Sequence, residues 1–214
     1  MVSQKQQTKT FTVPDIGKIN RKPLYSFFKR LFDIIFSLIG LIVLAIPMLV
    51  IAIIIKKDSK GKAIFSQERW GKNKKTFTIY KFRTMYIDAE EAGPKWAEKS
   101  DSRCTKIGQT LRRTRLDELP QLWNILKGDM SFVGPRPERE FFYNEFEKYI
   151  DGFTQRTKVI PGLTGWAQVN GGYDLSPEEK IVYDMEYIEK RSLRLDFKCL
   201  YLTVRIIFTG NGAR

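Results

Sequence analysis

Two adjacent carboxylates, Asp117 and Glu118, lie directly before a short apolar stretch and are the side chains whose position best suits chemistry. The chain contains no histidine, so the side chain that most often serves as general acid or base is missing. Proton or phosphoryl chemistry must then use carboxylates, lysines, tyrosines or a metal ion. Asp117 and Glu118 are therefore candidates for such chemistry.

The segment after this pair predicts a short helix that would carry the carboxylates at its N-terminus. Apolar residues recur at helical spacing over residues 119–126, Pro120 suits a first helical turn, and Gly128 can end the helix. Unpaired N–H groups at a helix start attract phosphate and lower the pKa of a carboxylate. The same residues also fit a plain helix cap, with Thr114 as the cap and Asp117 three residues later. On this segment alone, cap and catalytic carboxylate both remain open.

Four cations are candidates for binding a phosphate next to this pair. Arg136 lies between two prolines, whose fixed φ stiffens the backbone, so its guanidinium loses little entropy when it binds an anion. Lys81 and Arg83 alternate in a predicted strand and would share one face, where they repel unless an anion lies between them. Arg112 belongs to a basic run just before the acidic pair. A solvated surface position is the alternative for each of them.

The elements that must position these groups predict an α+β body that is mostly helical. Short strands are expected at residues 62–68 and 75–83, around a turn at 70–73. Residues 88–102 are polar and mixed in charge, and predict a short helix and a mobile loop near the mouth of the site. An aromatic-rich amphipathic helix is expected over residues 138–156, and it suits a protein core better than a membrane.

Two further helices complete the predicted body. Ser176, Pro177 and Glu179 form a helix-start pattern, and this helix should run to about residue 190. The last helix has apolar residues at helical spacing over 197–208, with basic residues interspersed. Such a helix could lie on an anionic membrane surface.

Residues 34–55 form an uninterrupted uncharged run that, as a straight helix, would be about 33 Å long, enough to cross a hydrocarbon core. Pro47 interrupts the run and favours a kink. Basic residues, which prefer the cytoplasmic side, flank both ends: Lys18, Arg21, Lys22, Lys29 and Arg30 before, and Lys56, Lys57, Lys60 and Lys62 after. A helix broken at Pro47 that enters and leaves by one leaflet satisfies both flanks. A single spanning helix remains the alternative, since such helices tolerate proline.

Composition limits the partners and the compartment. A net charge of +13 implies an anionic partner, which could be nucleic acid, an acidic membrane surface or a phosphorylated substrate. Cys104 and Cys199 form no close pair or metal-ligand cluster, so we expect reduced thiols in a cytoplasmic body. We divide the chain into a flexible segment at 1–24, a re-entrant membrane helix at 25–60 and a cytosolic catalytic domain at 61–214.

Three motifs in order carry a family resemblance. Residues 116–137 read Leu-Asp-Glu-Leu-Pro-Gln-Leu-Trp-Asn-Ile-Leu-Lys-Gly-Asp-Met-Ser-Phe-Val-Gly-Pro-Arg-Pro, which resembles the catalytic core of the bacterial sugar transferases, the monotopic phosphoglycosyl transferases. Residues 81–85, Lys-Phe-Arg-Thr-Met, and 161–171, Pro-Gly-Leu-Thr-Gly-Trp-Ala-Gln-Val-Asn-Gly, resemble two further motifs of this family. The resemblance covers the chain from about residue 25 to its end.

The resemblance implies a reaction and a location. It implies transfer of sugar-1-phosphate from a UDP-sugar to undecaprenyl phosphate with release of UMP, the first membrane step of exopolysaccharide, capsule or O-antigen synthesis. The location implied is the cytoplasmic leaflet of the bacterial inner membrane, with the catalytic domain facing the cytoplasm. The family's helix-break-helix dips into one leaflet and often has Ser before the proline, where this chain has Ile46.

The resemblance also assigns roles to residues. Asp117 would be the nucleophile and a candidate ligand of the expected Mg²⁺ cofactor, and Glu118 a supporting or metal-proximal group. The phosphate contacts would be Arg136, Lys81, Arg83 and Arg112.

Two other classes of protein are the alternatives to this interpretation: a membrane-tethered nucleic-acid-binding module, and a single-span scaffold without activity. With the resemblance we expect no nucleic-acid partner, and a homo-oligomer is compatible with the sequence. No residue can be tied to the sugar, so glucose, galactose and N-acetylated hexosamines all remain open.

Overall fold

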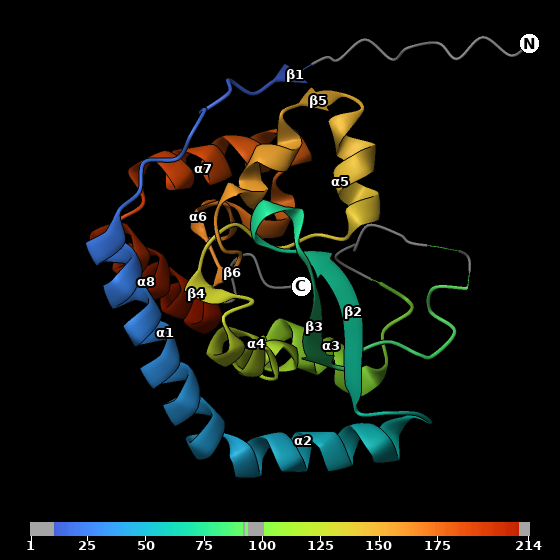
Figure 1. Ribbon diagram of the computed structural model, residues 1–214. Helices are drawn as coiled ribbons and strands as arrows, with labels where there is room; N and C mark the ends of the chain where they lie inside the picture. Colours follow the sequence, from blue (N-terminus) through green and yellow to red (C-terminus); the bar gives the residue numbers. More distant parts are fainter. Residues whose placement is uncertain (1–10, 92, 94–100, 210–214) are drawn as a thin grey trace, which may run out of the picture.

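The computed structural model describes residues 11–91, 93 and 101–209 (Figure 1). The helices are α1 (Pro23–Val43), α2 (Ala45–Asp58), α3 (Lys106–Arg113), α4 (Gln121–Lys127), α5 (Glu140–Glu147), α6 (Trp166–Val169), α7 (Pro177–Lys190) and α8 (Leu193–Thr209). The strands are β1 (Phe11–Thr12), β2 (Ile64–Trp70), β3 (Thr76–Phe82), β4 (Ser131–Val133), β5 (Ile150–Asp151) and β6 (Gly162–Thr164). They pair as β1–β5, β2–β3 and β4–β6, which confirms a mostly helical α+β fold with small sheets.

The apolar run folds into two helices, α1 and α2, that are bent by 60° relative to each other. The break is at Leu44, so the predicted position at Pro47 is corrected by three residues. Pro47 instead lies in the first turn of α2, where a missing N–H does not matter, and its ring disfavours a helical carbonyl at Val43. Within the described ranges no single helix is long and apolar enough to cross a membrane, whereas this bent pair together passes that test of length and composition.

Polar contacts join α1 to the rest of the molecule, and Figure 1 shows α1 alongside α8. The buried Asp33 accepts hydrogen bonds from the Ser131 hydroxyl at 3.1 Å and the Phe132 N–H at 3.0 Å, both on β4. Arg30 donates two hydrogen bonds of 2.7 Å to carbonyls in the last turn of α4. The last carbonyls of a helix lack partners within the helix, so the Arg30 guanidinium supplies hydrogen bonds to the C-terminal end of α4.

The predicted hairpin is confirmed as the antiparallel pair β2–β3, with both strands starting slightly later than expected. Its turn contains Asn73 and Lys74 with positive φ. Directly after β3, the buried Arg83 donates to the carbonyls of Ser59 at 2.7 Å and Lys60 at 2.6 Å. The hairpin is therefore fixed to the C-terminal end of α2.

The predicted long helix over residues 138–156 is wrong, because α5 ends at Glu147 and the chain turns through β5 into a 3₁₀ turn, η3 (Phe153–Lys158). The Glu147 carboxylate accepts the N–H groups of Gly152 at 3.0 Å and Thr154 at 2.8 Å, and Gly152 has a φ of 86°. This side chain stabilises the turn that replaces the helix. Phe153 is buried, and Phe146 and Tyr149 pack against the same cluster, which confirms the predicted core role for these three, whereas Phe141 is 46% exposed.

The prediction of a flexible segment at residues 1–24 is wrong for residues 11–22, while residues 1–10 lie outside the described part. Phe11–Thr12 pairs in parallel with β5, and Val13 is 7% exposed within the main hydrophobic cluster. A two-residue strand has no periodicity to reveal it in the sequence. The folded body therefore includes chain from both sides of the apolar run.

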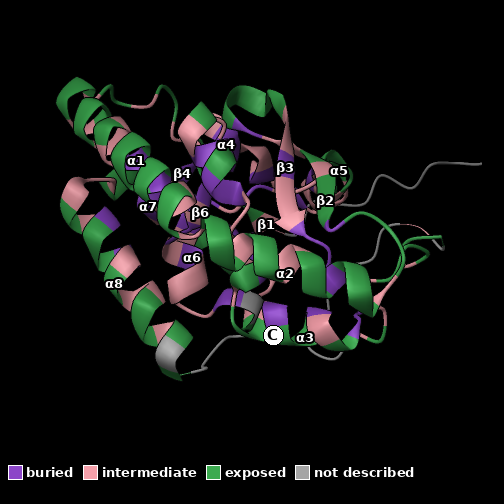
Figure 2. Ribbon diagram, turned by 90° about the horizontal axis from the view of Figure 1, so that it is seen from below, coloured by how far each residue is buried: buried purple, intermediate pink, exposed green. Residues whose placement is uncertain are grey.

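The last two helices agree with the prediction, and Figure 2 shows α1, α2 and much of α8 as exposed ribbon. Ser176 and Glu179 form the expected capping box of α7. On α8, large apolar side chains are exposed, namely Phe197, Tyr201, Val204 and Ile207. Cys104 and Cys199 are buried free thiols, as expected. Of the predicted loop at 88–102, residues 88–91 form a turn, and residues 92 and 94–100 lie outside the described part.

Candidate active site

A cavity of about 690 Å³ runs along the β2–β3 hairpin and brings all six predicted site residues together. Its lining includes the acidic pair and the four candidate cations: Asp117, Glu118, Lys81, Arg83, Arg112 and Arg136. These residues come from β3 and its end, from α3, from the 3₁₀ turn η2 (Leu116–Glu118) and from the loop after β4. Segments distant in sequence thus converge on one site (Figure 1).

The acidic pair lies in η2 and not at the start of α4, which begins only at Gln121. The capping-box alternative is also wrong: the Thr114 hydroxyl donates to the Thr110 carbonyl at 2.9 Å, at the end of α3. Arg115 follows with a φ of 60°, which separates the turn from α3. Asp117 is thus not used as a helix cap.

Glu118 is neutralised by two cations, although it is only 7% exposed. Its Oε1 accepts from Arg136 Nη2 at 2.5 Å and from Lys81 Nζ at 3.2 Å. Burial acts to raise the pKa of Glu118, but the charges of Arg136 and Lys81 outweigh it and hold that pKa well below its usual range. Glu118 therefore stays ionised at neutral pH and serves as the anchor of two cations.

Asp117 is equally buried, yet no hydrogen bond or ion pair joins its carboxylate to the rest of the described chain. Burial, followed by the negative charge of Glu118, raises the pKa of Asp117 to about 6. The expectation of a lowered pKa at a helix start is therefore wrong. At neutral pH the site holds an ionised carboxylate that nothing nearby neutralises directly, which is the condition of a nucleophile.

Asp117→Asn should stabilise the fold above pH 6 and lose that advantage near pH 4. The pKa of Asp117 is raised in the folded state from an ordinary 3.8 to about 6. Its stabilising contribution is therefore present below pH 4 and is lost as the pH rises through 6. Asparagine imitates the protonated form at every pH. At pH 7.5 the thermal unfolding midpoint of the variant should lie about 6–12 °C above that of the unsubstituted chain, and an equal difference at pH 4 would contradict the burial argument.

The four cations have different partners. Arg136 and Lys81 bind Glu118, and Arg112 Nε donates to the Thr84 hydroxyl at 3.0 Å with no carboxylate partner in the described ranges. Arg83 lines the cavity, but its guanidinium donates to carbonyls at the end of α2, so its contact with phosphate stays a prediction. A strand pattern cannot distinguish a cation that serves a ligand from one that completes a helix.

Several cavity residues had no signal of their own in the sequence. Arg69 and Arg139 line it and pair with Glu138 at 3.1 Å and Glu90 at 2.9 Å. Their place depends on how the hairpin and the start of α5 pack, which periodicity does not report.

The carboxylates of the cavity allow a test of the expected Mg²⁺. Glu90, Glu118 and Glu138 are in ion pairs, which leaves Asp117 as the unpaired carboxylate among the described lining residues. No group of three or more acidic or cysteine side chains suited to a metal occurs in the parts described. Mg²⁺ is usually held by one or two carboxylates together with substrate phosphates. The donor set fits an ion that binds with a diphosphate through Asp117, and does not fit a cage built by the protein alone.

Fold and site together define a class of protein: a small α+β body with a cationic cavity around an acidic pair, joined to a bent apolar helix pair. The model of the family described as "Bacterial sugar transferase" matches residues 24–210. The chain belongs to this family, as the three motifs indicated.

Named relatives agree with this membership. A UDP-N-acetylgalactosamine-undecaprenyl-phosphate N-acetylgalactosaminephosphotransferase from Aeromonas hydrophila is 42% identical over 202 residues, which cover 93% of this chain and 48% of the relative. A Bacillus subtilis protein, provisionally named as an undecaprenyl-phosphate N-acetylgalactosaminyl 1-phosphate transferase, is 51% identical over 71% of this chain and 82% of its own length. A UDP-glucose:undecaprenyl-phosphate glucose-1-phosphate transferase from Klebsiella pneumoniae is 44% identical over 87% of this chain and 41% of its own. The chain thus spans less than half of the first and third relatives.

Proposed function

We propose that this chain transfers sugar-1-phosphate from a UDP-sugar to undecaprenyl phosphate and releases UMP. The observation that carries the proposal is the contrast within the acidic pair: Glu118 is neutralised by Arg136 and Lys81, whereas the buried Asp117 is ionised and unpaired. A cationic cavity around one reactive carboxylate suits a diphosphate substrate. The names of the relatives support these substrates.

In the first step, a carboxylate oxygen of Asp117 attacks the β-phosphorus of the UDP-sugar. The bond from that phosphorus to the bridging oxygen breaks, and UMP leaves with that oxygen. In the second step, a phosphate oxygen of undecaprenyl phosphate attacks the same phosphorus. The acyl-phosphate bond breaks, the diphospholipid-sugar leaves, and the Asp117 carboxylate is restored. This division of one displacement into two predicts ping-pong kinetics.

The neighbouring residues bind and orient the diphosphate. Glu118 fixes Arg136 and Lys81 through one shared oxygen, which holds both positive charges at the wall of the cavity, where they attract phosphate oxygens. Arg112 adds a charge that no carboxylate of the described chain neutralises. A bound Mg²⁺, held through Asp117, would supply neutralisation of the diphosphate oxygens.

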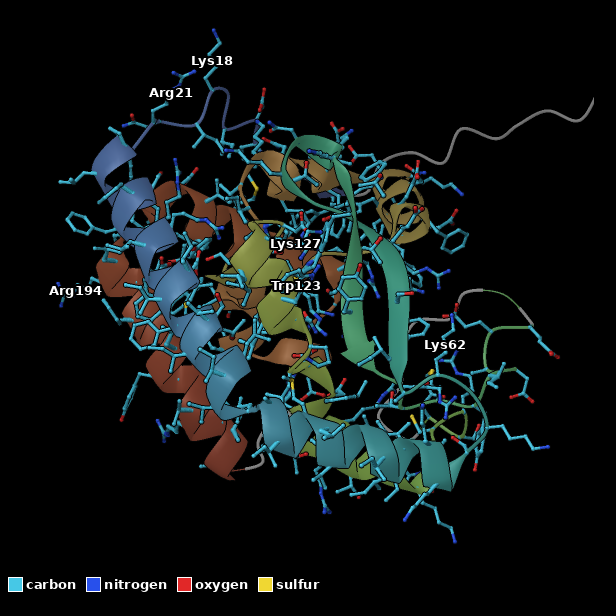
Figure 3. All side chains as sticks on the ribbon, turned by 60° about the horizontal axis from the view of Figure 1, so that its bottom comes forward. Lys18, Arg21, Lys62, Trp123, Lys127 and Arg194 are labelled. Carbon is cyan, nitrogen blue, oxygen red and sulfur yellow. The ribbon has the colours of Figure 1, made fainter. Side chains whose placement is uncertain are left out.

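We also propose that α1 and α2 enter and leave the cytoplasmic leaflet of the bacterial inner membrane, with the body in the cytoplasm. The 60° bend and the exposed apolar side chains along both helices support this placement. Figure 3 shows Lys18 and Arg21 before α1 and Lys62 after α2. Both ends of the pair thus carry cations, which prefer the cytoplasmic side.

The activity is tested with a panel of radiolabelled UDP-sugars, undecaprenyl phosphate and Mg²⁺. The panel contains glucose, galactose and N-acetylated hexosamines, since the relatives are named for different sugars. We expect UMP and a labelled lipid product from at least one UDP-sugar, with exchange of labelled UMP into UDP-sugar when the lipid is left out. A membrane-reconstituted chain that releases no UMP from any member of the panel would contradict the proposal.

The membrane placement predicts that residues 18 and 62 are accessible from one side only. Single variants Lys18→Cys and Lys62→Cys place thiols at exposed positions (Figure 3). A membrane-impermeant maleimide should label both in inside-out vesicles and neither in intact spheroplasts. The unsubstituted chain gives the background, because Cys104 and Cys199 are buried. Labelling of the two positions from opposite sides would establish a spanning helix instead.

A further inference from the structure

The cavity extends beyond the acidic pair, to an end that the proposed chemistry does not use. There, η3 packs against the hairpin turn and on α7, and α6 packs on α7 as well. In Figure 1, α6 lies level with the turn of the hairpin, whereas α3 lies near the strand ends that adjoin α2. Arg156 on η3 and Gln168 on α6 line the cavity at this end. Gln168 belongs to the motif at residues 161–171, to which the chemistry gives no role.

Arg156 brings unused donors to this end. It is 3% exposed, and its Nη2 forms an ion pair of 2.6 Å with Asp184. Its guanidinium lies over the rings of Phe153 and Tyr143, at 5.1 Å and 5.8 Å from their centroids. Its Nε and Nη1 are buried and have no hydrogen-bond partner. Buried N–H groups are nearly always paired, so two orphans on a rigidly held side chain point to a ligand that accepts from them.

Gln168 brings one unused acceptor. Its Nε2 donates to the Leu163 carbonyl at 3.0 Å, which fixes the orientation of the amide because a carbonyl can bind only the NH₂ end. Its Oε1 is buried and has no partner. Both residues line the cavity, so its wall at this end contains an unpaired acceptor together with unpaired donors.

We propose that this end binds the uracil base of the UDP-sugar, an inference that rests on the proposed function. The imide edge of uracil presents a carbonyl, an N–H and a second carbonyl in a row. Gln168 Oε1 accepts the uracil N3–H, and Arg156 donates to a uracil carbonyl. Cytosine has an acceptor at N3, which would face the Gln168 acceptor and leave both unpaired. The pair thus selects uridine nucleotides, since buried polar groups reject a base that leaves them unpaired.

The sugar is the other part of the substrate that could reach this end, because hydroxyl groups both donate and accept. UMP distinguishes binding of the base from binding of the transferred sugar, since it carries uracil and ribose but not the transferred sugar. Binding of UMP, CMP and N3-methyl-UMP to the 214-residue chain in nanodiscs, measured by calorimetry, therefore tests the base directly. With the unsubstituted chain we expect N3-methyl-UMP and CMP to bind at least about 10-fold more weakly than UMP. Equal affinities, or no binding of UMP, would overturn the proposal without any substitution.

Gln168→Met removes the acceptor at similar volume and supplies the second measurement. UMP should bind about 10-fold more weakly to this variant, and most of the penalty for N3-methylation should disappear. Gln155→Met is the matched control: it lies on η3, but its side chain bonds to Ile16 and Pro14 and does not line the cavity, so UMP affinity should not change. Weaker binding of UDP-sugar by Gln168→Met with unchanged UMP affinity would assign this end to the sugar and overturn the proposal.

The two proposals fail in different ways. A chain that discriminates UMP from N3-methyl-UMP but never releases UMP from UDP-sugars contradicts the proposed reaction and leaves the base site standing. A chain that turns over UDP-sugars but binds all three nucleotides equally contradicts the base site alone.

Discussion

Asp117→Asn should abolish UMP release from every UDP-sugar while the protein remains folded. An amide oxygen is a poor nucleophile, and no second unpaired carboxylate lines the cavity among the described residues, so no neighbour can replace Asp117. Loss of a covalent nucleophile should lower the turnover rate by roughly 10³-fold or more. The measurement is UMP release, together with mass spectrometry of the chain after incubation with UDP-sugar alone.

The unsubstituted chain should carry a sugar-phosphate adduct on Asp117, and the variant none. Because burial and then Glu118 raise the pKa of Asp117 to about 6, formation of the adduct should slow as the pH falls below 6. Asp15→Asn serves as control, since Asp15 is exposed and its partners in the described chain are the Lys158 ammonium and the Gly17 N–H. Turnover in Asp117→Asn at more than a few per cent of the normal rate would assign the nucleophile elsewhere.

Arg136→Met should cause the second large effect, on stability and on activity together. Among the described residues it leaves the buried Glu118 with Lys81 as its direct ion-pair partner, and a buried charge that loses a partner costs about 3 kcal/mol of folding free energy. It also removes the guanidinium from the diphosphate, which should lower turnover by roughly 10²-fold. Thermal unfolding and UMP release measure the two effects separately.

The double variant Arg136→Met with Glu118→Gln tells these roles apart. The introduced glutamine carries no charge, so most of the lost stability should return, whereas the phosphate still lacks its arginine and activity should stay low. If activity returns with stability, Arg136 serves only Glu118 and does not contact the substrate. Arg139→Met is the control for stability, because its partner Glu90 is 41% exposed and such surface pairs contribute little.

The sequence identified the parts of this molecule that local patterns encode. Alternation revealed the hairpin, and a capping box revealed the start of α7. Adjacent acids in a chain without histidine singled out Asp117 and Glu118, and both line the cavity. Three motifs indicated the family that the comparison then showed. These features need no knowledge of what packs against them.

Tertiary contacts decide the rest, and here the sequence was misleading. Arg83 alternates with Lys81 as a ligand-binding cation would, yet its guanidinium is bound by carbonyls at the end of α2, more than twenty residues away. The pKa of Asp117 follows from burial beside Glu118, which no helix pattern reports. The long helix predicted over 138–156 ends where the Glu147 carboxylate binds N–H groups further along the chain. Periodicity describes one face of one element, and each of these outcomes depends on a second element.

One short piece of strand links the chemistry to the bilayer. On β3 and its end, Lys81 holds Glu118, and two residues later Arg83 holds the end of α2, so about 7 Å of backbone joins both contacts. If α2 lies in the leaflet as proposed, this strand fixes the distance between α2 and the acidic pair, and so sets the height of the transferred phosphate above the lipid headgroups. Thinning or thickening of the membrane would then move Asp117 and Glu118 relative to the headgroups, because the strand between Lys81 and Arg83 transmits the shift of α2. The rate of the proposed reaction would therefore depend on lipid composition.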